Sequence, residues 1–281
     1  MHTVLEIIKK TTDFFSAKGI ESPRLNAELL VGHALGLKRM QLYLEFERPL
    51  SEADLEKIRP LVRRRAQHEP VQYILGETEF FGMKLKVDRR ALIPRPETEQ
   101  LIEHVVAACS GSTPTRMLDL GTGSGAIALA LARSFPAASI MAVDASADAL
   151  SLARENAVAA AADGAVSFLL SDWFEAIPTG AYDVIVSNPP YLSAVETAET
   201  SPEVRQFEPV GALTAGDEGL ADLFKIIATA PRYLVSGGLL ALETGVAQRE
   251  RLLTHANTAG FSRVEARQDL TGRDRFVLAF K

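Results

Sequence analysis

The sequence predicts an α/β fold in which a doubly wound, mostly parallel sheet follows a small helical domain. From about residue 97 onward, short apolar runs alternate with segments of helical periodicity, a pattern typical of a parallel sheet covered on both faces. Residues 3–70 show helical periodicity alone. Residues 71–96 contain a short alternating run and then two closely spaced prolines. We therefore predict a helical domain over residues 1–70, a hairpin linker over 71–96 and a larger sheet domain over 97–281.

The helical domain contains three segments with recognisable signals. Apolar residues recur near helical spacing over 4–15, and a second apolar face lies over 24–35. Ser51 followed by Asp54 predicts a capping box at the start of a third helix. Pro60 should kink or split that helix, because a proline in a helix interior removes one hydrogen bond and clashes with the preceding turn.

Two charged clusters each allow two interpretations. Arg63, Arg64 and Arg65 could form a docking surface for an acidic partner, but we favour a solvated helix face. Glu97 and Glu99 could line a pocket. The simpler explanation is that they stabilise the start of a helix, where negative charge is favourable.

The linker combines a short strand pattern with a stiff segment. Met83, Leu85 and Val87 alternate with polar residues, which predicts a strand or hairpin. The following Ile93-Pro94-Arg95-Pro96 should be extended, because each proline fixes its own φ and restricts the residue before it. We place the junction between the two domains here.

Seven apolar runs are strand candidates in the larger domain. They cover residues 117–120, 140–143, 166–169, 184–187, 239–243, 264–268 and 275–280. Helical patterns separate the first five, so these strands should run parallel. A short turn containing Gly272 joins the last two, which predicts an antiparallel final strand.

The composition narrows the class of protein. Lysine and arginine total 30 against 36 acidic residues among 281, so binding of a nucleic acid would need a local basic patch. We expect no stable nucleic-acid partner.

The single cysteine excludes an intramolecular disulfide and a cysteine-based metal cluster. The histidines show no ligand spacing, so we assign no metal. No run approaches the roughly 18 apolar residues of a membrane span, and no signal peptide is evident. We expect a cytoplasmic protein without a membrane partner.

A glycine-rich turn follows the first predicted strand of the larger domain. The turn consists of Gly121, Thr122, Gly123, Ser124 and Gly125, and a helical segment begins directly after it. Glycines allow a ligand to approach the backbone closely, and the helix start offers free N–H groups. Nineteen residues further on, the next strand ends at Asp144, which could accept hydrogen bonds from both hydroxyls of a ribose. The G-x-G-x-G spacing differs from the dinucleotide fingerprint and favours a nucleoside without a pyrophosphate, which S-adenosylmethionine fits.

The third strand leads into Asp172 and Trp173, where we expect an adenine ring to bind. Asp172 could accept a hydrogen bond from the exocyclic amine, and Trp173 could cover the ring, although a plain core position for Trp173 remains the alternative.

The segment 193–217 is long, polar and weakly patterned. It is either a lid over a substrate or a disordered loop.

The fourth strand ends in Asn188, Pro189, Pro190 and Tyr191. Ligands of open α/β sheets bind beyond the carboxyl ends of the strands. The prolines stop the strand, so their carbonyls can face a pocket. A planar amino group conjugated to a π system fits this arrangement, because the Asn188 oxygen and the Pro189 carbonyl can accept its two hydrogens while Tyr191 flanks its plane.

Fixing the geometry should matter more than electronic activation of such a nitrogen. Full loss of amide conjugation would cost about 18–20 kcal/mol. One well-aimed polar contact supplies about 2.7–4 kcal/mol, whereas proximity and alignment supply about 7–11 kcal/mol. We therefore expect in-line positioning of the nitrogen against an activated methyl group, with partial localisation of its lone pair as the smaller effect.

These residues together resemble the release-factor protein-(glutamine-N5) methyltransferase family. The matching segments are EPVQYILGETEFFG at 69–82, LIPRPETE at 92–99, LDLGTGSGAIALALA at 118–132, SDWF at 171–174, SNPPY at 187–191 and FEP at 207–209. The resemblance implies a class I S-adenosylmethionine-dependent methyltransferase with a seven-stranded, Rossmann-like sheet behind a helical docking domain. One departure is Thr244, where we expect an aliphatic residue.

The resemblance also implies a substrate and roles for residues. The substrate would be the glutamine of the Gly-Gly-Gln segment in class I peptide-chain release factors, and the spent cofactor would be S-adenosylhomocysteine. The residues implied to hold the cofactor are Gly121, Thr122, Gly123, Ser124, Gly125, Asp144, Trp173 and Asn188. The residues implied to hold the glutamine are Asn188, Pro189, Pro190 and Tyr191, with Asn188, Pro189 and Tyr191 catalytic.

Three other functions are compatible with parts of the sequence. A DNA adenine-N6 methyltransferase would act on a similar conjugated amino group, but it would need a basic surface to grip a duplex. A glutamine methyltransferase acting on a ribosomal protein would share the same catalytic residues. A translation-associated binding module without catalysis is disfavoured by the intact glycine turn and by residues 188–191.

Overall fold

The computed structural model of the chain describes residues 2–178 and 180–281. Met1 and Thr179, which fall in the predicted regions 1–70 and 97–281, lie outside the described residues. The chain divides into two compact units. The first runs to Glu77 and also includes Ser201–Phe207, and the second comprises Thr78–Thr200 and Glu208–Lys281.

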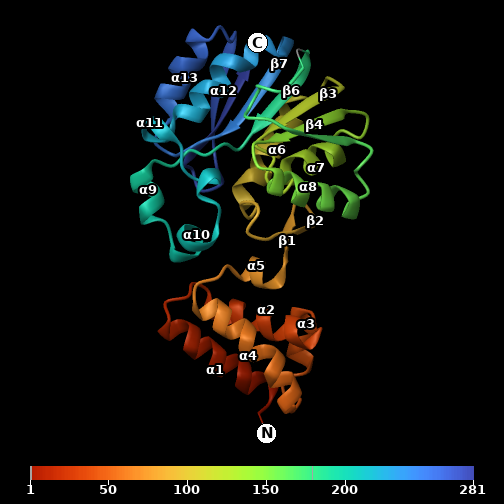
Figure 1. Cartoon of the computed structure of the whole chain (residues 1–281), viewed down its shortest axis with the longest axis vertical. Helices are drawn as coiled ribbons and strands as arrows, with labels where there is room; N and C mark the ends of the chain where they lie inside the picture. The colour runs from red at the N-terminus through yellow and green to blue at the C-terminus, as the bar shows by residue number, and fades with distance from the viewer. Residues whose placement is uncertain (1, 179) are drawn as a thin grey trace. The chain divides into compact units, whose positions relative to one another are not determined.

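The first unit is helical, as the sequence predicts. Its helices are α1 (Val4–Ala17), α2 (Pro23–Leu35), α3 (Arg39–Leu44), α4 (Glu52–Ala66), α5 (Val71–Leu75) and α10 (Pro202–Phe207) (Figure 1). Residues spaced along α1, α2 and α4, among them Phe15, Leu30 and Ile58, form one hydrophobic core. Ser51 accepts a hydrogen bond from the backbone of Asp54, so the predicted capping box at the start of α4 is confirmed.

Helix α4 continues through Pro60, so the predicted split of this helix is wrong. Pro60 and Glu56, four residues earlier, are both exposed. The carbonyl that loses its hydrogen bond to the proline can therefore bind water, which removes most of the cost of an unsatisfied backbone group. The capping box and the core contact of Ile58 stabilise the turns on the amino-terminal side.

Arg65 does not lie on a solvated helix face, and our interpretation of this residue was wrong. Its side chain is 2% exposed, and its guanidinium donates to Asn26 Oδ1 at 2.7 Å and to the Glu69 carbonyl at 3.1 Å. It also forms an ion pair with Glu203 of α10. Arg65 follows the buried Ile58 by seven residues and therefore lies on the same face of α4.

The second unit contains the hairpin and the main sheet. Strands β1 (Glu77–Phe80) and β2 (Met83–Lys86) form a two-stranded sheet, which confirms the predicted hairpin. The main sheet has seven strands in the order β5-β4-β3-β6-β7-β9-β8. These are β3 (Arg116–Leu120), β4 (Ser139–Asp144), β5 (Val166–Leu170), β6 (Tyr182–Ser187), β7 (Leu234–Glu243), β8 (Arg263–Gln268) and β9 (Asp274–Phe280).

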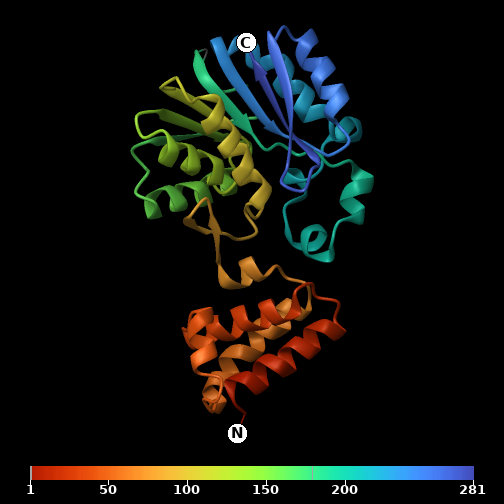
Figure 2. The same ribbon diagram turned by 180° about the vertical axis from the view of Figure 1, so that it is seen from behind.

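The topology of the main sheet agrees with the predicted α/β class. Strands β3 to β7 pair in parallel, and β9 is antiparallel to both of its neighbours. Figure 2, seen from behind, shows the carboxyl-terminal strands at one edge of the sheet. Strand β7 begins earlier than predicted, because its Ser236-Gly237-Gly238 sequence, which resembles a turn, is accommodated within the strand at a register shift against β6.

Helices cover both faces of the sheet. They are α6 (Pro96–Ala108), α7 (Ala126–Ser134), α8 (Ala147–Ala159), α12 (Ala221–Thr229) and α13 (Arg249–Thr258) (Figure 1). Met117 packs in the cluster of α6 and α7, whereas its neighbour Leu118 packs in the cluster of α12 and α13. Successive side chains of a strand point to opposite faces, so one strand contributes to both cores. By the same alternation, Asp119 and Glu243 face the side of α6 and α7.

The segment 193–217 is not irregular, contrary to its weak pattern in the sequence. It contains α9 (Ala194–Glu199), α10 and the short 3₁₀ helix at Val210–Ala212, and α11 (Gly216–Gly219) begins near its end. Ser193 caps α9 through a capping box with Glu196. Among the described residues, no helix combines the length and the apolar character needed to cross a membrane.

Candidate active site

The second unit has a cavity beyond the carboxyl ends of its central strands. Its volume is about 490 Å³, which is ordinary for a site that binds one small molecule. The lining includes Gly121, Thr122, Gly123 and Ser124 after β3, Asp144 at the end of β4, Trp173 after β5, and Asn188 and Pro190 after β6. Residues predicted from four separate segments are therefore brought together.

Three predicted residues do not line this cavity. Gly125 has a φ of 85°, and a side chain there would come within 3.2 Å of Ala153 Cβ. Its role in the structure is thus to let α7 begin close to α8. Pro189 and Tyr191 are the other two, and the side chain of Tyr191 is instead directed to the buried Glu243.

The glycine turn is shaped by positive φ angles and by its neighbours. Gly121 and Gly123 have φ values of 70° and 55°, which glycine adopts at little cost. A side chain at Gly121 would lie within 3.4 Å of the Trp173 ring, so this glycine keeps the wall of the cavity open beside the indole. The turn is fixed by a hydrogen bond from the Thr122 amide to the Val143 carbonyl at 2.9 Å.

Asp144 is held at the edge of the cavity by two backbone donors. Oδ2 accepts from Gly123 N at 2.9 Å, and Oδ1 accepts from Ser146 N at 2.8 Å. Burial raises the pKa of this carboxyl, and the hydrogen bonds from the backbone amides oppose the shift. Each carboxylate oxygen keeps a second lone pair, so Asp144 can still accept two hydroxyl groups of a ligand.

Asp119 is a buried carboxyl that the sequence analysis did not single out. Its Oδ2 accepts from Thr122 Oγ1 at 2.6 Å and from Ala128 N at 3.1 Å, whereas Oδ1 has no hydrogen-bond partner. Burial raises its pKa to about 7. Asp119 therefore connects the glycine turn to the first turn of α7. Its place between apolar residues at the end of a strand was the available signal.

The end of β5 supplies a flat wall. Trp173 has a φ of 48°, and its Nε1 donates to Asp222 Oδ1 at 3.1 Å, so the indole is held by α12. Both Trp173 and Asp222 line the cavity, which goes against a plain core position for the indole. Asp172 also lines it, but one of its oxygens accepts from Lys225 Nζ at 3.1 Å.

Residues 188–191 are tied to a buried polar network. Asn188 Nδ2 donates to Thr98 Oγ1 at 3.1 Å, and Thr98 Oγ1 donates to Glu243 Oε2 at 2.7 Å. Tyr191 donates its hydroxyl proton to Glu243 Oε1 at 3.2 Å. Burial raises the pKa of Glu243, and the hydrogen bond from Thr98 and the charge of Arg275 oppose that shift. Burial also raises the pKa of Tyr191.

Two motifs distant in the sequence close the site on another side. Glu208 accepts from Ile93 N at 3.2 Å and from Arg95 Nη2 at 2.6 Å, and its carboxylate is almost fully buried. Pro209, Gly211 and Ala212, which follow Glu208, line the cavity together with Leu92, Pro94 and Arg95. The segments 92–99 and 207–209 are thus joined by one ion pair and a backbone contact.

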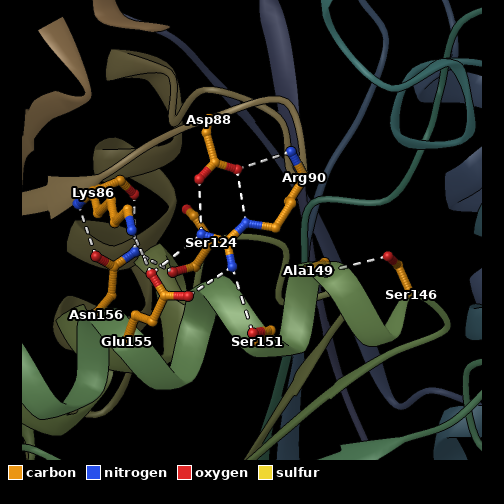
Figure 3. A network of polar contacts seen from close by, with 9 residues as sticks. All are labelled: Lys86, Asp88, Arg90, Ser124, Ser146, Ala149, Ser151, Glu155 and Asn156. Atoms are coloured by element: carbon orange, nitrogen blue, oxygen red, sulfur yellow. Dashed lines mark hydrogen bonds and ion pairs between the residues drawn. The ribbon is translucent and has the colours of Figure 1, made fainter.

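The linker is also tied to the glycine turn through α8, as Figure 3 shows. Asn156 accepts from Lys86 N at 2.7 Å and donates to the carbonyls of Lys86 at 3.0 Å and Ser124 at 2.9 Å. Arg90 pairs with Asp88 and Glu155 beside it. Ser124 and Arg90 line the cavity, so this network fixes part of its wall. Glu97 and Glu99 lie in the first turn of α6, and Glu99 accepts from the Phe81 amide at 2.7 Å.

Family models match both parts of the chain. Residues 6–76 match the PrmC N-terminal domain, and residues 96–204 match the methyltransferase small domain. A release factor glutamine methyltransferase from Chlorobaculum tepidum is 44% identical, with 97% of this chain and 95% of the relative covered. One of the same name from Rhodopirellula baltica is 39% identical, with 98% and 95% covered.

Solved structures share the fold at lower identity. The hMettl16 catalytic domain superposes with a TM-score of 0.60 at 18% identity, covering 79% of this chain and 81% of that chain. A 16S rRNA methyltransferase from T. thermophilus, in complex with AdoMet and guanosine, gives a TM-score of 0.52 at 22% identity, covering 73% and 49%. These likenesses establish the class I methyltransferase fold of the second unit.

Proposed function

This chain belongs to the release factor glutamine methyltransferase family, and on that premise we propose that it methylates the side-chain amide nitrogen, N5, of the glutamine in the Gly-Gly-Gln segment of class I peptide-chain release factors. It is a methyltransferase, and its methyl donor is S-adenosylmethionine. The observation that carries the proposal is Asn188, whose carboxamide is held at the same cavity as the glycine turn and Asp144.

The residues of the cavity fit the cofactor. Gly121 and Gly123 leave room beside the backbone for its amino-acid part, and Asp144 retains free lone pairs for the ribose hydroxyls. Trp173 offers a flat surface for the adenine. Asp172 keeps one carboxylate oxygen that is not used by Lys225. Thr122, Ser124 and Asn188 complete the lining that we assign to the cofactor.

The chain's own residues position the nitrogen that is methylated. When bound, S-adenosylmethionine would supply an activated methyl group on its sulfonium, with S-adenosylhomocysteine as the leaving group, and the glycine turn, Asp144 and Trp173 would hold it. Asn188 Oδ1, at the cavity, accepts one hydrogen of the glutamine amide, and we assign the second to the carbonyl of the adjoining Pro189, which lies outside the cavity lining. Together they turn one face of the nitrogen toward the methyl group. Pro190, which lines the cavity, flanks the plane of the amide, and Tyr191, which lies outside the lining, fixes the end of the segment 188–191 through its hydrogen bond to Glu243. A dedicated base is not needed before transfer, because the N–H becomes acidic only once the methyl is attached, and its proton then passes to water.

We assign the capture of the protein substrate to the helical domain, residues 1–70. Its independent core and its match to the PrmC N-terminal domain support this role. A chain lacking residues 1–70 should still bind the cofactor and still methylate a short Gly-Gly-Gln peptide at high concentration, but it should lose activity on the complete release factor. Full activity of this shortened chain on the release factor would contradict the assignment. We place the enzyme in the cytoplasm, where its substrate acts.

Mass spectrometry tests the proposed substrate directly. Purified enzyme is incubated with S-adenosylmethionine and, in parallel, with a class I release factor, a mixture of ribosomal proteins and a DNA duplex. We expect one added methyl on the Gly-Gly-Gln glutamine. Methylation of a ribosomal protein or of adenine, with none on the release factor, would replace this proposal by one of the two alternatives.

A further inference from the structure

A chain of hydrogen bonds leads from the Asn188 carboxamide into the interior of the second unit. The hydroxyl of Thr98 lies between Asn188 Nδ2, at 3.1 Å, and Glu243 Oε2, at 2.7 Å. Thr98 belongs to the first turn of α6, and Glu243 is the last residue of β7. Both are buried, at 4% and 1% exposure, so neither exchanges this partner for bulk water.

The order of donors along this chain is fixed by chemistry. An ionised carboxylate can only accept hydrogen bonds, so the hydroxyl proton of Thr98 is directed to Glu243. The oxygen of Thr98 then offers only lone pairs to Asn188, and the group that faces it must be the NH₂ of the carboxamide. The carbonyl oxygen of Asn188 is thereby turned away from Thr98. A carboxamide has two nearly isosteric ends, and only its hydrogen-bond partners decide which way it points.

Burial raises the pKa of Glu243, and the groups around it oppose this rise because they stabilise the ionised form. Two hydroxyls, from Thr98 and Tyr191, are directed to its two oxygens. The guanidinium of Arg275, on the neighbouring strand β9, lies 5.9 Å from the centre of the Tyr191 ring and pairs with Asp269 at 3.8 Å. Its positive charge favours a negative charge on Glu243. Glu243 therefore connects Asn188 and Tyr191, the two ends of the segment 188–191.

We propose that Thr98 and Glu243 are positioning residues that fix the Asn188 carboxamide with its oxygen, rather than its nitrogen, toward the substrate amide. This inference rests on the proposed function, because the partner that we assign to the free carboxamide oxygen of Asn188 is the side-chain amide of the substrate glutamine. If the carboxamide rotated by half a turn, its NH₂ would face the NH₂ of the glutamine, and two donors would oppose each other. Tyr191 donates to the same carboxyl group, so Glu243 fixes both ends of the segment 188–191.

Substitution of Thr98 separates this role from simple packing. Thr98→Val keeps the shape but removes the hydroxyl, and Thr98→Ser keeps the hydroxyl. We expect Thr98→Val to lower kcat on a Gly-Gly-Gln peptide about 10-fold to 100-fold, the range of one aligned polar contact. The dissociation constant of S-adenosylmethionine should stay within about threefold, and Thr98→Ser should restore most of the rate. Wild-type rates for Thr98→Val, or equally low rates for both variants, would overturn the proposal.

A second measurement does not depend on catalysis. In protein labelled with ¹⁵N-asparagine, the NH₂ signals of Asn188, assigned by their absence in Asn188→Ala, should exchange slowly with solvent in the wild type and in Thr98→Ser. In Thr98→Val they should exchange much faster. Rapid exchange in the wild type would overturn the orientation even if the enzyme methylates release factors. Slow exchange without methylation of the Gly-Gly-Gln glutamine would instead show that the proposed function, and not the hydrogen-bond chain, is at fault.

Discussion

Replacement of Asp144 by alanine is expected to weaken the binding of S-adenosylmethionine about 100-fold. The two oxygens of Asp144 accept from Gly123 N and Ser146 N, and each has one lone pair left for a ribose hydroxyl. A hydrogen bond to a charged group contributes about 1.5–3 kcal/mol. Two such bonds at the lower end of this range give about 3 kcal/mol, which corresponds to a change of roughly 100-fold in the dissociation constant.

Isothermal titration calorimetry with S-adenosylmethionine measures this loss, and the rate at saturating cofactor provides the second reading. We expect kcat to change little, because the proposed role of Asp144 is to bind the ribose and not the reacting atoms. Asp148→Ala is a matched control, since Asp148 is an exposed acidic residue in the first turn of α8. A dissociation constant for Asp144→Ala within about threefold of the wild-type value would refute the ribose assignment.

The same residue should make cofactor binding depend on pH. Burial raises the pKa of Asp144, so its carboxyl takes up a proton at a higher pH than an exposed aspartate does. Only the ionised form accepts from both hydroxyls, so affinity should fall as the pH decreases through this raised pKa. The sign is opposite for the stability of the free protein: a raised pKa in the folded state contributes stability at low pH that is lost as the pH increases. Asp144→Ala should remove the cofactor effect, and a pH-independent affinity in the wild type would contradict the reasoning.

Three further predictions concern other polar groups of the two units. Asn188→Ala should lower kcat about 100-fold or more and should lower cofactor affinity much less. Equal losses in both would contradict its proposed contact with the glutamine amide. The pKa of Asp119 is raised to about 7, so its contribution to stability should be lost as the pH increases from about 4 to about 7. Asp119→Asn should therefore gain roughly 2–3 kcal/mol over the wild type between pH 5 and pH 7.5 in urea unfolding, and a constant difference would refute the shift. Arg65→Met should destabilise the helical unit by about 3 kcal/mol, and hydrogen exchange in α2 and α4 should become faster. Substitution of the exposed Arg63 by methionine is the control and should have almost no effect on stability. Equal effects of the two substitutions would argue against the buried role of Arg65.

The sequence predicts the sheet well because its signals are local. Each parallel strand is a short apolar run followed by glycine, proline or an acidic residue, so strand ends such as Asp144 and Asn188 can be placed without knowing the fold. Since these ends meet at one edge of a parallel sheet, the cofactor side of the cavity also follows from the sequence.

The sequence does not predict the pairings between distant segments. The contacts of Thr98 with Glu243 and of Arg95 with Glu208 span 145 and 113 residues, and no periodicity links their partners. Arg65 was misjudged for a related reason. An arginine on the apolar face of an amphipathic helix resembles a surface residue until the partners that satisfy its guanidinium are known. The regular structure of segment 193–217 is equally hidden, because its helices are too short to show a period.

The inclusion of Ser201–Phe207 in the helical unit has a consequence for how the chain is synthesised. Arg65 leaves the ribosome long before Glu203, the carboxylate that lies 138 positions later and pairs with it. Until then, the nascent amino-terminal helices must fold around a guanidinium that lacks this partner, which is costly for a buried charge. We therefore expect residues up to Glu77, produced alone, to unfold at a lower urea concentration than the same helices in the complete chain. The part of the protein that is made first would then reach its final stability only when translation is about three quarters complete.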